Sequence, residues 1–244
     1  MTASHYTHGT SEAEQSRLTA MNRLLNDRCL QPAAFVEGER VVDFGAGIGQ
    51  FARAIGRVTG VPVVCIERSA AQIQGALSQA DADQETHLLD MREGDVDAPP
   101  LRSEEWGAFD VSHTRFLLEH VRDPLAVVKS MVLAVRPGGR IILADDDYAG
   151  LRLWPEPPRF GLVWQAYQRT YDRHGNDPIV GRRLVQLLHH AGATPKRNTW
   201  VFFGGCAGDP EFGGFVMNLA HIIEEAGADI VEIGISAKTS SRRA

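Results

Sequence analysis

Three glycines follow a short apolar run in the segment Val41-Val42-Asp43-Phe44-Gly45-Ala46-Gly47-Ile48-Gly49. Glycine adopts positive φ angles readily and lets a ligand approach the backbone closely. When such a loop leads from a strand into a helix, the free N–H groups of the first helical turn offer hydrogen bonds and partial positive charge to a ligand. A nicotinamide dinucleotide requires the spacing G-x-G-x-x-G, whose last position here is Gln50. The G-x-G-x-G spacing therefore argues against a nicotinamide cofactor.

Acidic residues accompany the next two apolar runs. Glu67 ends the run at residues 62–67, 24 positions after Asp43. A carboxylate at this point can accept hydrogen bonds from both hydroxyls of a ribose, whereas Glu67 alone is equally consistent with a solvated charge at a strand end. Its register with the glycine loop favours the ribose interpretation. Asp90 and Asp95 compete for a second ligand contact, because each follows an apolar stretch.

Groups that can move protons or anchor a substrate follow two later apolar runs. They are His113, Arg115 and His120 after residues 109–112, and Asp145, Asp146, Asp147 and Tyr148 after residues 140–144. Open α/β sheets bind ligands at the carboxyl ends of their strands, so these side chains are candidates for the reactive end of a site. We take His120 and Asp147 as the catalytic candidates; the alternatives are a histidine bonded to nearby backbone and a solvated acidic loop. No metal ligand is assigned.

The order of helical and strand patterns indicates which elements position these residues. The two patterns alternate, which predicts parallel βαβ units. The expected fold is α/β, a Rossmann-like, seven-stranded, mostly parallel sheet with helices on both faces. Its strands are expected at residues 40–44, 62–67, 87–92, 109–112, 140–144, 199–204 and 229–235. Residues 1–35 are expected to form an N-terminal helical segment and residues 36–244 the main domain, with a lid-like insertion at about 145–180.

The combination of motifs resembles the class I S-adenosylmethionine-dependent methyltransferases. Residues 41–49 resemble their first motif, and Glu67 matches their ribose-binding acid. The segments that resemble the adenine-binding segment, the fourth-strand motif and the turn before strand five are residues 92–96, 109–121 and 136–140. The sequence of these motifs most resembles the ubiquinone/menaquinone C-methyltransferase-like, small-molecule branch, and the resemblance covers about residues 38–147.

The resemblance implies S-adenosylmethionine as cofactor and in-line methyl transfer to a small-molecule acceptor. It implies cofactor-binding roles for Asp43, Gly45, Ala46, Gly47, Gly49, Glu67, Arg68, Asp95, Val96 and Arg115. Asp95 is preferred to Asp90 because the Gly94-Asp95 pair fits the motif. Arg17 is added as a partner for the carboxylate of the cofactor, with a solvated helix face as the alternative. Two other interpretations stay open: a nicotinamide-dependent oxidoreductase and a non-catalytic S-adenosylmethionine-binding protein.

Charge and composition restrict the remaining partners. The formal net charge of −6 repels the phosphate backbone, so no nucleic-acid partner is expected. No apolar run approaches the roughly 20 residues needed to cross a bilayer, so no membrane partner is expected. The three cysteines, Cys29, Cys65 and Cys206, are widely separated, which suits a reducing cytoplasm. A homodimer is the one protein partner that we consider.

Overall fold

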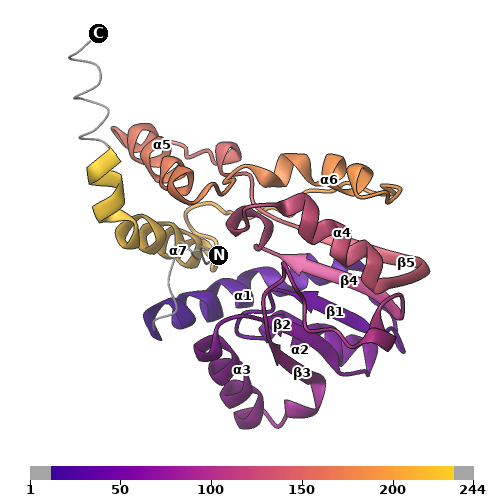
Figure 1. Ribbon diagram of the computed structural model, residues 1–244. Helices are drawn as coiled ribbons and strands as arrows, with labels where there is room; N and C mark the ends of the chain where they lie inside the picture. The colour runs from indigo at the N-terminus through magenta and orange to yellow at the C-terminus, as the bar shows by residue number, and fades with distance from the viewer. Residues whose placement is uncertain (1–11, 234–244) are drawn as a thin grey trace.

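The computed structural model describes residues 12–233 (Figure 1). Its strands are β1 (Val41–Phe44), β2 (Val63–Glu67), β3 (Leu89–Glu93), β4 (Phe109–Arg115) and β5 (Val135–Ala144). The α-helices include α1 (Glu12–Ala33), α2 (Gln50–Thr59), α3 (Ala70–Ala82), α4 (Pro124–Ala134), α5 (Phe160–Thr170), α6 (Leu184–His190) and α7 (Phe212–Glu225). Short 3-10 helices connect them, among them η3 (Leu118–His120), η4 (Tyr148–Gly150) and η5 (Tyr171–His174).

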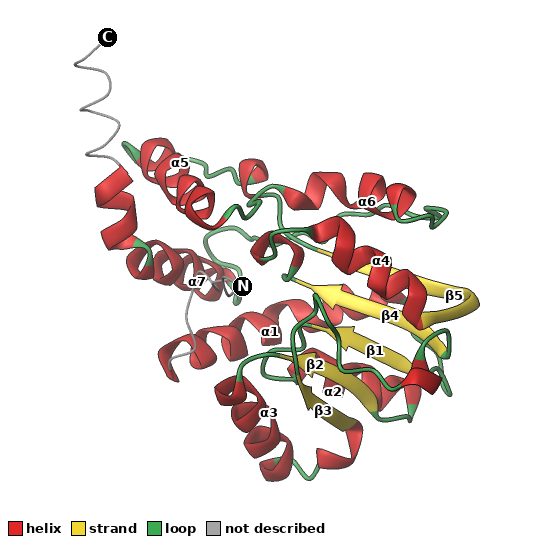
Figure 2. Cartoon of the chain, viewed as in Figure 1, coloured by secondary structure: helices red, strands yellow, loops and turns green. Residues whose placement is uncertain are grey.

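The strands form one parallel sheet in the order β3-β2-β1-β4-β5. Val42 of β1 pairs with Val64 of β2 and with Ser112 of β4, so β1 lies at the centre, where the strand order reverses. Figure 2 shows the strand arrowheads directed toward the side of the molecule where α5 and α7 lie. The carboxyl ends of the strands therefore meet at one edge, which is where open α/β sheets bind ligands.

Two apolar clusters hold the sheet between helices. Val42 belongs to a cluster with Met131 of α4, whereas its neighbour Val41 belongs to a cluster with Leu25 of α1 and Ile55 of α2. The separation follows from strand geometry, because successive side chains point to opposite faces of a sheet. β1 and β2 are buried along their whole length, as expected of strands that are covered on both faces.

Local chemistry fixes two of the helix starts. Asp123 Oδ1 accepts a hydrogen bond from Ala126 N at 3.0 Å, and Pro124 occupies the first turn of α4, where no N–H donor is needed. Helix α2 begins directly after Gly49, whose φ is 67°. The last glycine of the loop therefore stands where helical N–H groups have no partner within the helix.

The prediction of a seven-stranded sheet is wrong for residues 12–233, whose sheet has five strands. Residues 199–204 keep the alternation of a strand: Val201 and Phe203 pack against the cluster that contains Val41, while Trp200 is 82% exposed. These residues form no strand, and Arg28 Nη1 donates to the Phe202 carbonyl oxygen at 2.9 Å. The alternation predicted the directions of the side chains, but residues 199–204 do not pair with any strand of the described sheet.

The predicted seventh strand is also corrected. Residues 229–233 are helical, and the remaining residues 234–235 lie outside the described residues. Ile230 N donates to Ala226 O at 2.9 Å, which is a helical hydrogen bond. The error arose because a short apolar run does not by itself distinguish a buried strand from a buried helical segment.

Residues 136–140, which resemble the turn before strand five, lie within β5 and interrupt its regular pairing with β4. Phe109 pairs with Val135 and Val111 pairs with Arg140, so the register shifts across the glycines. A bulge of this kind lets the strand continue although extra residues are inserted.

The predicted lid, residues 145–180, is largely helical and contains η4, α5 and η5. Trp164, Tyr167 and Tyr171 are 7%, 0% and 0% exposed and pack against Ile222 of α7. These aromatic residues therefore form a core between α5, η5 and α7. Trp164 Nε1 donates to the Tyr148 carbonyl oxygen at 2.7 Å, which ties α5 to the chain directly after β5. No helix within the described residues is long and apolar enough to span a bilayer.

Replacing Ile55, which is fully buried in α2, should test the cluster that joins α1, α2 and the sheet. Ile55→Ala should lower the free energy of unfolding by about 2–5 kcal/mol, because it removes apolar contacts and leaves a cavity. Val58→Ala in the same helix is the control, since Val58 is 42% exposed and should cost no more than about 0.5 kcal/mol. Urea unfolding followed by circular dichroism measures both, and equal losses would contradict this packing.

Candidate active site

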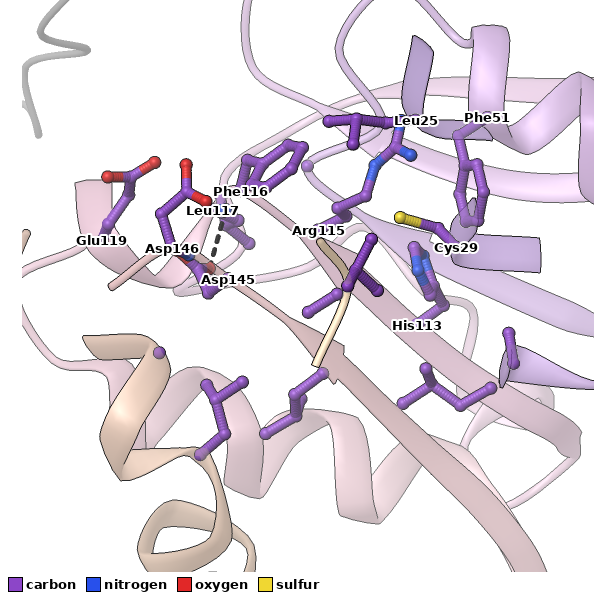
Figure 3. Close-up of a pocket in the computed structure, with 18 of the residues that line it drawn as sticks. Leu25, Cys29, Phe51, His113, Arg115, Phe116, Leu117, Glu119, Asp145 and Asp146 are labelled. Atoms are coloured by element: carbon purple, nitrogen blue, oxygen red, sulfur yellow. Dashed lines mark hydrogen bonds between the residues drawn. The ribbon is translucent and has the colours of Figure 1, made fainter. Parts of the chain in front are cut away.

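A cavity of about 1900 Å³ opens at the carboxyl ends of the strands, and Figure 3 shows part of its wall. Residues that follow or end all five strands line it, together with parts of α1, α7 and the segment 193–205. Typical ligand pockets have volumes of roughly 300–1,000 Å³, so this one has room for two ligands side by side. The predicted cofactor residues that line it are Arg17, Asp43, Gly45, Ala46, Gly47, Glu67, Arg68, Asp95, Val96 and Arg115.

The glycine loop has backbone dihedral angles that residues with a side chain rarely adopt. Gly45, Gly47 and Gly49 have φ angles of 74°, 56° and 67°, which favour glycine. A Cβ at Gly45 would lie 2.8 Å from Leu117 Cδ1, so the close approach of the two loops also requires glycine there. Gly49, which is also a predicted cofactor residue, does not line the cavity. A Cβ on it would lie 3.3 Å from Ala76 Cβ of α3. Gly45 and Gly47 therefore shape the cavity, while Gly49 permits close helix packing.

Asp43 is bonded to a second strand. Its Oδ1 lies 2.7 Å from His113 Nδ1, and both side chains are almost fully buried. The parallel register of β1 and β4 makes the two residues direct neighbours. The sequence analysis names His113 as a candidate but gives no sign of this pairing. The bond fixes the Asp43 carboxylate just ahead of the glycine loop.

Glu67 links the glycine loop to the end of β2. Its Oε2 accepts a hydrogen bond from Gly47 N at 2.9 Å, and its Oε1 accepts one from Ser69 N at 2.9 Å. Burial raises the pKa of Glu67, while the backbone hydrogen bonds from Ser69 and Gly47 oppose the rise. The carboxylate is thus held in one orientation at the cavity wall.

Asp95 and Asp90 have different surroundings. Asp95 lines the cavity, and its Oδ1 accepts a hydrogen bond from Asp97 N at 3.0 Å. Asp90 is paired with Arg92 at 2.6 Å, and Arg92 is also paired with Glu105 at 2.6 Å. The geometry therefore favours Asp95, rather than Asp90, as the aspartate beside a ligand.

Two arginines from the predicted cofactor set anchor α1 at the cavity. Arg115 Nη2 donates to the side-chain oxygens of Asn22 and Asn26 on α1, the second at 3.1 Å. Arg17 Nη1 donates to Asn218 Oδ1 of α7 at 2.7 Å. Each arginine therefore joins α1 to another element as well as lining the cavity.

Asp145, Asp146 and Glu119 form an acidic cluster where β4 and β5 end (Figure 3). Asp145 Oδ2 accepts hydrogen bonds from Leu117 N and Leu118 N at 3.1 and 2.8 Å. Burial raises the pKa of Asp145 to about 8 and that of Asp146 to about 6, and the charge of Asp146 contributes to the rise at Asp145. Burial, followed by the charges of both aspartates, also raises the pKa of Glu119. The cluster therefore holds protons at a pH where exposed carboxyl groups are ionised.

Glu119 is the member of the cluster that the sequence analysis does not single out. Its side chain is 2% exposed, and it lines the cavity. The Glu119 carbonyl oxygen accepts a hydrogen bond from Asp177 N at 3.2 Å, which holds η3 against the predicted lid. The only sequence signal was its place in the segment after β4, because a glutamate in a turn is ordinarily solvated.

The two predicted catalytic residues line the cavity in different settings. His120 is 5% exposed, its Nε2 lies 3.5 Å from Glu119 Oε1, and its ring stacks on Tyr171 with centroids 5.8 Å apart. Asp147 accepts two hydrogen bonds from Arg182, from Nε at 2.9 Å and Nη2 at 2.7 Å. Asp147 is therefore part of an ion pair, and the catalytic roles of both residues stay predictions.

The raised pKa values in the acidic cluster predict how stability depends on pH. Between about pH 5 and 8, Asp145 keeps its proton in the folded protein but loses it in the unfolded chain, where its pKa is about 3.9. The folded state then binds more protons, so the free energy of unfolding should fall as the pH rises through this interval. Urea unfolding of the ligand-free protein at pH 5, 6.5 and 8 measures it.

The variant Asp145→Asn should show a smaller fall, because its amide does not titrate. Asp81→Asn, at an exposed position of α3, is the control and should keep the parent slope. A parent stability that rises from pH 5 to 8, or a slope unchanged by Asp145→Asn, would contradict the assignment of the protons to this cluster.

Comparison with known proteins places this geometry in a family. Residues 15–196 of the chain match the family model described as a methyltransferase domain. The ubiquinone biosynthesis O-methyltransferase of Acinetobacter baumannii (strain ACICU) is 30% identical over 177 residues, which cover 70% of each chain. An uncharacterised 37.1 kDa protein in a transposon of Streptomyces fradiae is 29% identical over 168 residues, and the match spans 64% of this chain and 43% of that protein.

Solved structures share the fold. The geranyl diphosphate C-methyltransferase of Streptomyces coelicolor A3(2) superposes with a TM-score of 0.61 at 15% identity, covering 91% of this chain and 79% of that one. The cyclase SpnF also gives a TM-score of 0.61, at 18% identity, covering 91% of this chain and 77% of that one. These likenesses show the fold, and the family model together with the ubiquinone enzyme shows the family. The chain belongs to the class I S-adenosylmethionine-dependent methyltransferases.

Proposed function

We propose that the chain transfers the methyl group of S-adenosylmethionine to a small-molecule acceptor bound at the ends of β4 and β5. The observation that carries this proposal is the single cavity of about 1900 Å³, which runs from the glycine loop to the acidic cluster and the predicted lid. Relatives named for ubiquinone biosynthesis and for geranyl diphosphate methylation support an acceptor of low molecular mass. The formal net charge of −6 supports the same class, because it disfavours nucleic acids.

The residues present fit the cofactor. Gly45 and Gly47 line the cavity without a Cβ, so a ligand can approach the backbone there closely. Glu67 is oriented at the end of β2 to accept ribose hydroxyls, and Asp95 lines the cavity after β3. We assign the methionine end to the neighbourhood of Arg17 and Arg115, whose positive charges suit a carboxylate.

Methyl transfer of this kind does not need a nucleophilic side chain from the protein. Bound S-adenosylmethionine supplies an activated methyl group on a sulfonium, so an acceptor atom can displace it in line. The residues of the chain position the acceptor, exclude water and take up its proton where one must leave. His120 is 5% exposed and sits between Glu119 and Tyr171, so it is placed to hold or pass a proton.

Two other functions make different predictions. A nicotinamide oxidoreductase would bind NAD in preference to S-adenosylmethionine, against the G-x-G-x-G spacing. A non-catalytic binding protein would bind S-adenosylmethionine without turnover, and the cyclase SpnF shows that this fold can carry another named activity.

We also propose a cytoplasmic location, supported by the free cysteines Cys29, Cys65 and Cys206. We propose a homodimer as well, supported by exposed apolar side chains such as Trp200 and Phe202.

S-adenosylmethionine and S-adenosylhomocysteine should bind with micromolar dissociation constants, equivalent to about 8 kcal/mol. Glu67→Ala and Asp95→Ala should each weaken binding roughly ten- to hundredfold, because each removes a hydrogen bond to a charged group. Asp90→Ala is the matched control and should leave the affinity unchanged, since Asp90 is paired with Arg92. Isothermal titration calorimetry measures all of these, and tight binding of NAD without S-adenosylmethionine binding would favour the oxidoreductase instead.

His120→Phe should lower kcat at least tenfold with little change in cofactor affinity, because a ring remains to stack on Tyr171 while both nitrogens are lost. Asp147→Ala should also lower kcat. Its control is Arg182→Ala, which breaks the same ion pair but keeps the carboxylate. If Arg182→Ala lowers kcat as much as Asp147→Ala does, the ion pair rather than the Asp147 carboxylate matters. Parent turnover in both His120→Phe and Asp147→Ala would place the acceptor elsewhere in the cavity.

A further inference from the structure

We propose that the methyl acceptor carries a positively charged amino group and that Glu119, within the acidic cluster, binds it. This inference rests on the proposed function, because it names the chemical class of the acceptor for the same site.

Glu119 has an oxygen with nothing bound to it. The Glu119 side chain is 2% exposed, and Oε2 has no hydrogen-bond partner, whereas Oε1 lies 3.5 Å from His120 Nε2. Leaving a buried carboxylate oxygen without a donor costs free energy. Glu119 lines the cavity, and Figure 3 shows its carboxylate beside that of Asp146. An ammonium group in the cavity would supply the missing donor, and its charge would favour the ionised form of Glu119 by opposing the rise of its pKa.

The donors that already reach the cluster are largely neutral. Asp145 accepts its hydrogen bonds from the backbone N–H groups of Leu117 and Leu118. Hydrogen bonds from the hydroxyls of Tyr171 and Tyr148 act on Glu119, where they oppose the rise of its pKa. Neutral donors orient the carboxyl groups but bring no positive charge, so they leave the pKa values of Asp145 and Glu119 raised. Glu119 and Asp145 therefore form the part of the cavity that is best suited to attract a cation.

The neighbouring arginines are engaged elsewhere or act on another member of the cluster. Arg115 donates to Asn22 and Asn26, and its guanidinium lies over the Phe51 ring, 4.0 Å from the ring centroid. The charges of Arg115 and Arg17 lower the pKa of Asp146, so they offset that carboxylate. Asp147 has its own partner in Arg182.

Aromatic side chains complete the environment of a cation. Tyr148 and Trp164 both line the cavity, with ring centroids 5.4 Å apart. The faces of aromatic rings attract ammonium groups. An anionic acceptor would raise the pKa values of the cluster further, and a neutral hydroxyl would bring no charge that lowers them. Within residues 12–233, no three His, Cys, Asp or Glu side chains are arranged to hold a metal ion, so a divalent cation is the weaker candidate.

Matched triplets of small ligands test the proposal on the full chain saturated with S-adenosylhomocysteine. Each triplet keeps one carbon frame and varies its end group, as in 2-phenylethylamine, 2-phenylethanol and 2-phenylacetate, with benzyl, 3-phenylpropyl and cyclohexylmethyl series added. Calorimetry at pH 7 should show at least one amine binding tenfold or more tightly than its own alcohol and carboxylate. Glu119→Gln should reduce that preference about tenfold while S-adenosylhomocysteine affinity stays at the parent value.

Glu104→Gln is the control, because it removes one carboxylate from an exposed position and should keep the amine preference. The proposal is overturned if no amine exceeds its matched alcohol, or if Glu119→Gln keeps the preference of the parent. It is also overturned if Glu119→Gln weakens S-adenosylhomocysteine binding tenfold, since Glu119 would then hold the amino group of the cofactor. Failure of the parent protein to bind S-adenosylhomocysteine would instead reject the proposed function itself.

Discussion

The parallel pairing of β1 with both β2 and β4 is the constraint on which the rest of the site depends. It brings the glycine loop, Glu67 and the segment after β4 to one edge of the sheet, although these lie far apart in the sequence. The hydrogen bond from Gly47 N to Glu67 and the contact between Asp43 and His113 then join neighbouring strands at that edge. The loops are therefore positioned by the sheet and by each other before any ligand binds, which lowers the ordering cost of binding.

The same edge contains buried acidic groups that oppose folding when they ionise. Asp145 is accommodated because the backbone N–H groups of Leu117 and Leu118 donate to it, and Glu119 because the hydroxyls of Tyr171 and Tyr148 donate to it. Burial that raises pKa values and leaves one oxygen unsatisfied is unfavourable for stability alone. Groups of this kind cluster at functional sites, where a ligand relieves the imbalance. A bound cation would relieve the imbalance in this cluster, because it would lower the raised pKa values and supply a donor to the unsatisfied oxygen.

What the sequence predicts well is what depends on neighbouring residues. The glycines ahead of α2 marked the loop correctly, because a positive φ angle is a property of a single residue. The order of the five observed strands along the chain also followed from apolar runs of suitable length. The part of the cavity wall beside the glycine loop was therefore largely predictable from its motif residues.

What the sequence does not predict depends on partners that are distant in the chain. Residues 199–204 alternate as a strand does, yet they lie without a ladder and bond to Arg28 instead. The ion pairs of Asp147 with Arg182 and of Asp90 with Arg92 decide which aspartates face a ligand, and only the fold reveals the first of them. The place of Glu119 after β4 did not reveal its burial, because the neighbouring Tyr171, which stacks on His120 of η3, comes from the distant predicted lid.

Transfer of a labelled methyl group tests the central claim most directly. The protein is incubated with S-adenosylmethionine labelled in its methyl group and with a mixture of small molecules, and the low-mass and macromolecular fractions are then separated. The account predicts that label enters a low-mass product in proportion to the S-adenosylhomocysteine formed. Cofactor that is bound but not consumed, or label found only in protein or nucleic acid, would contradict it.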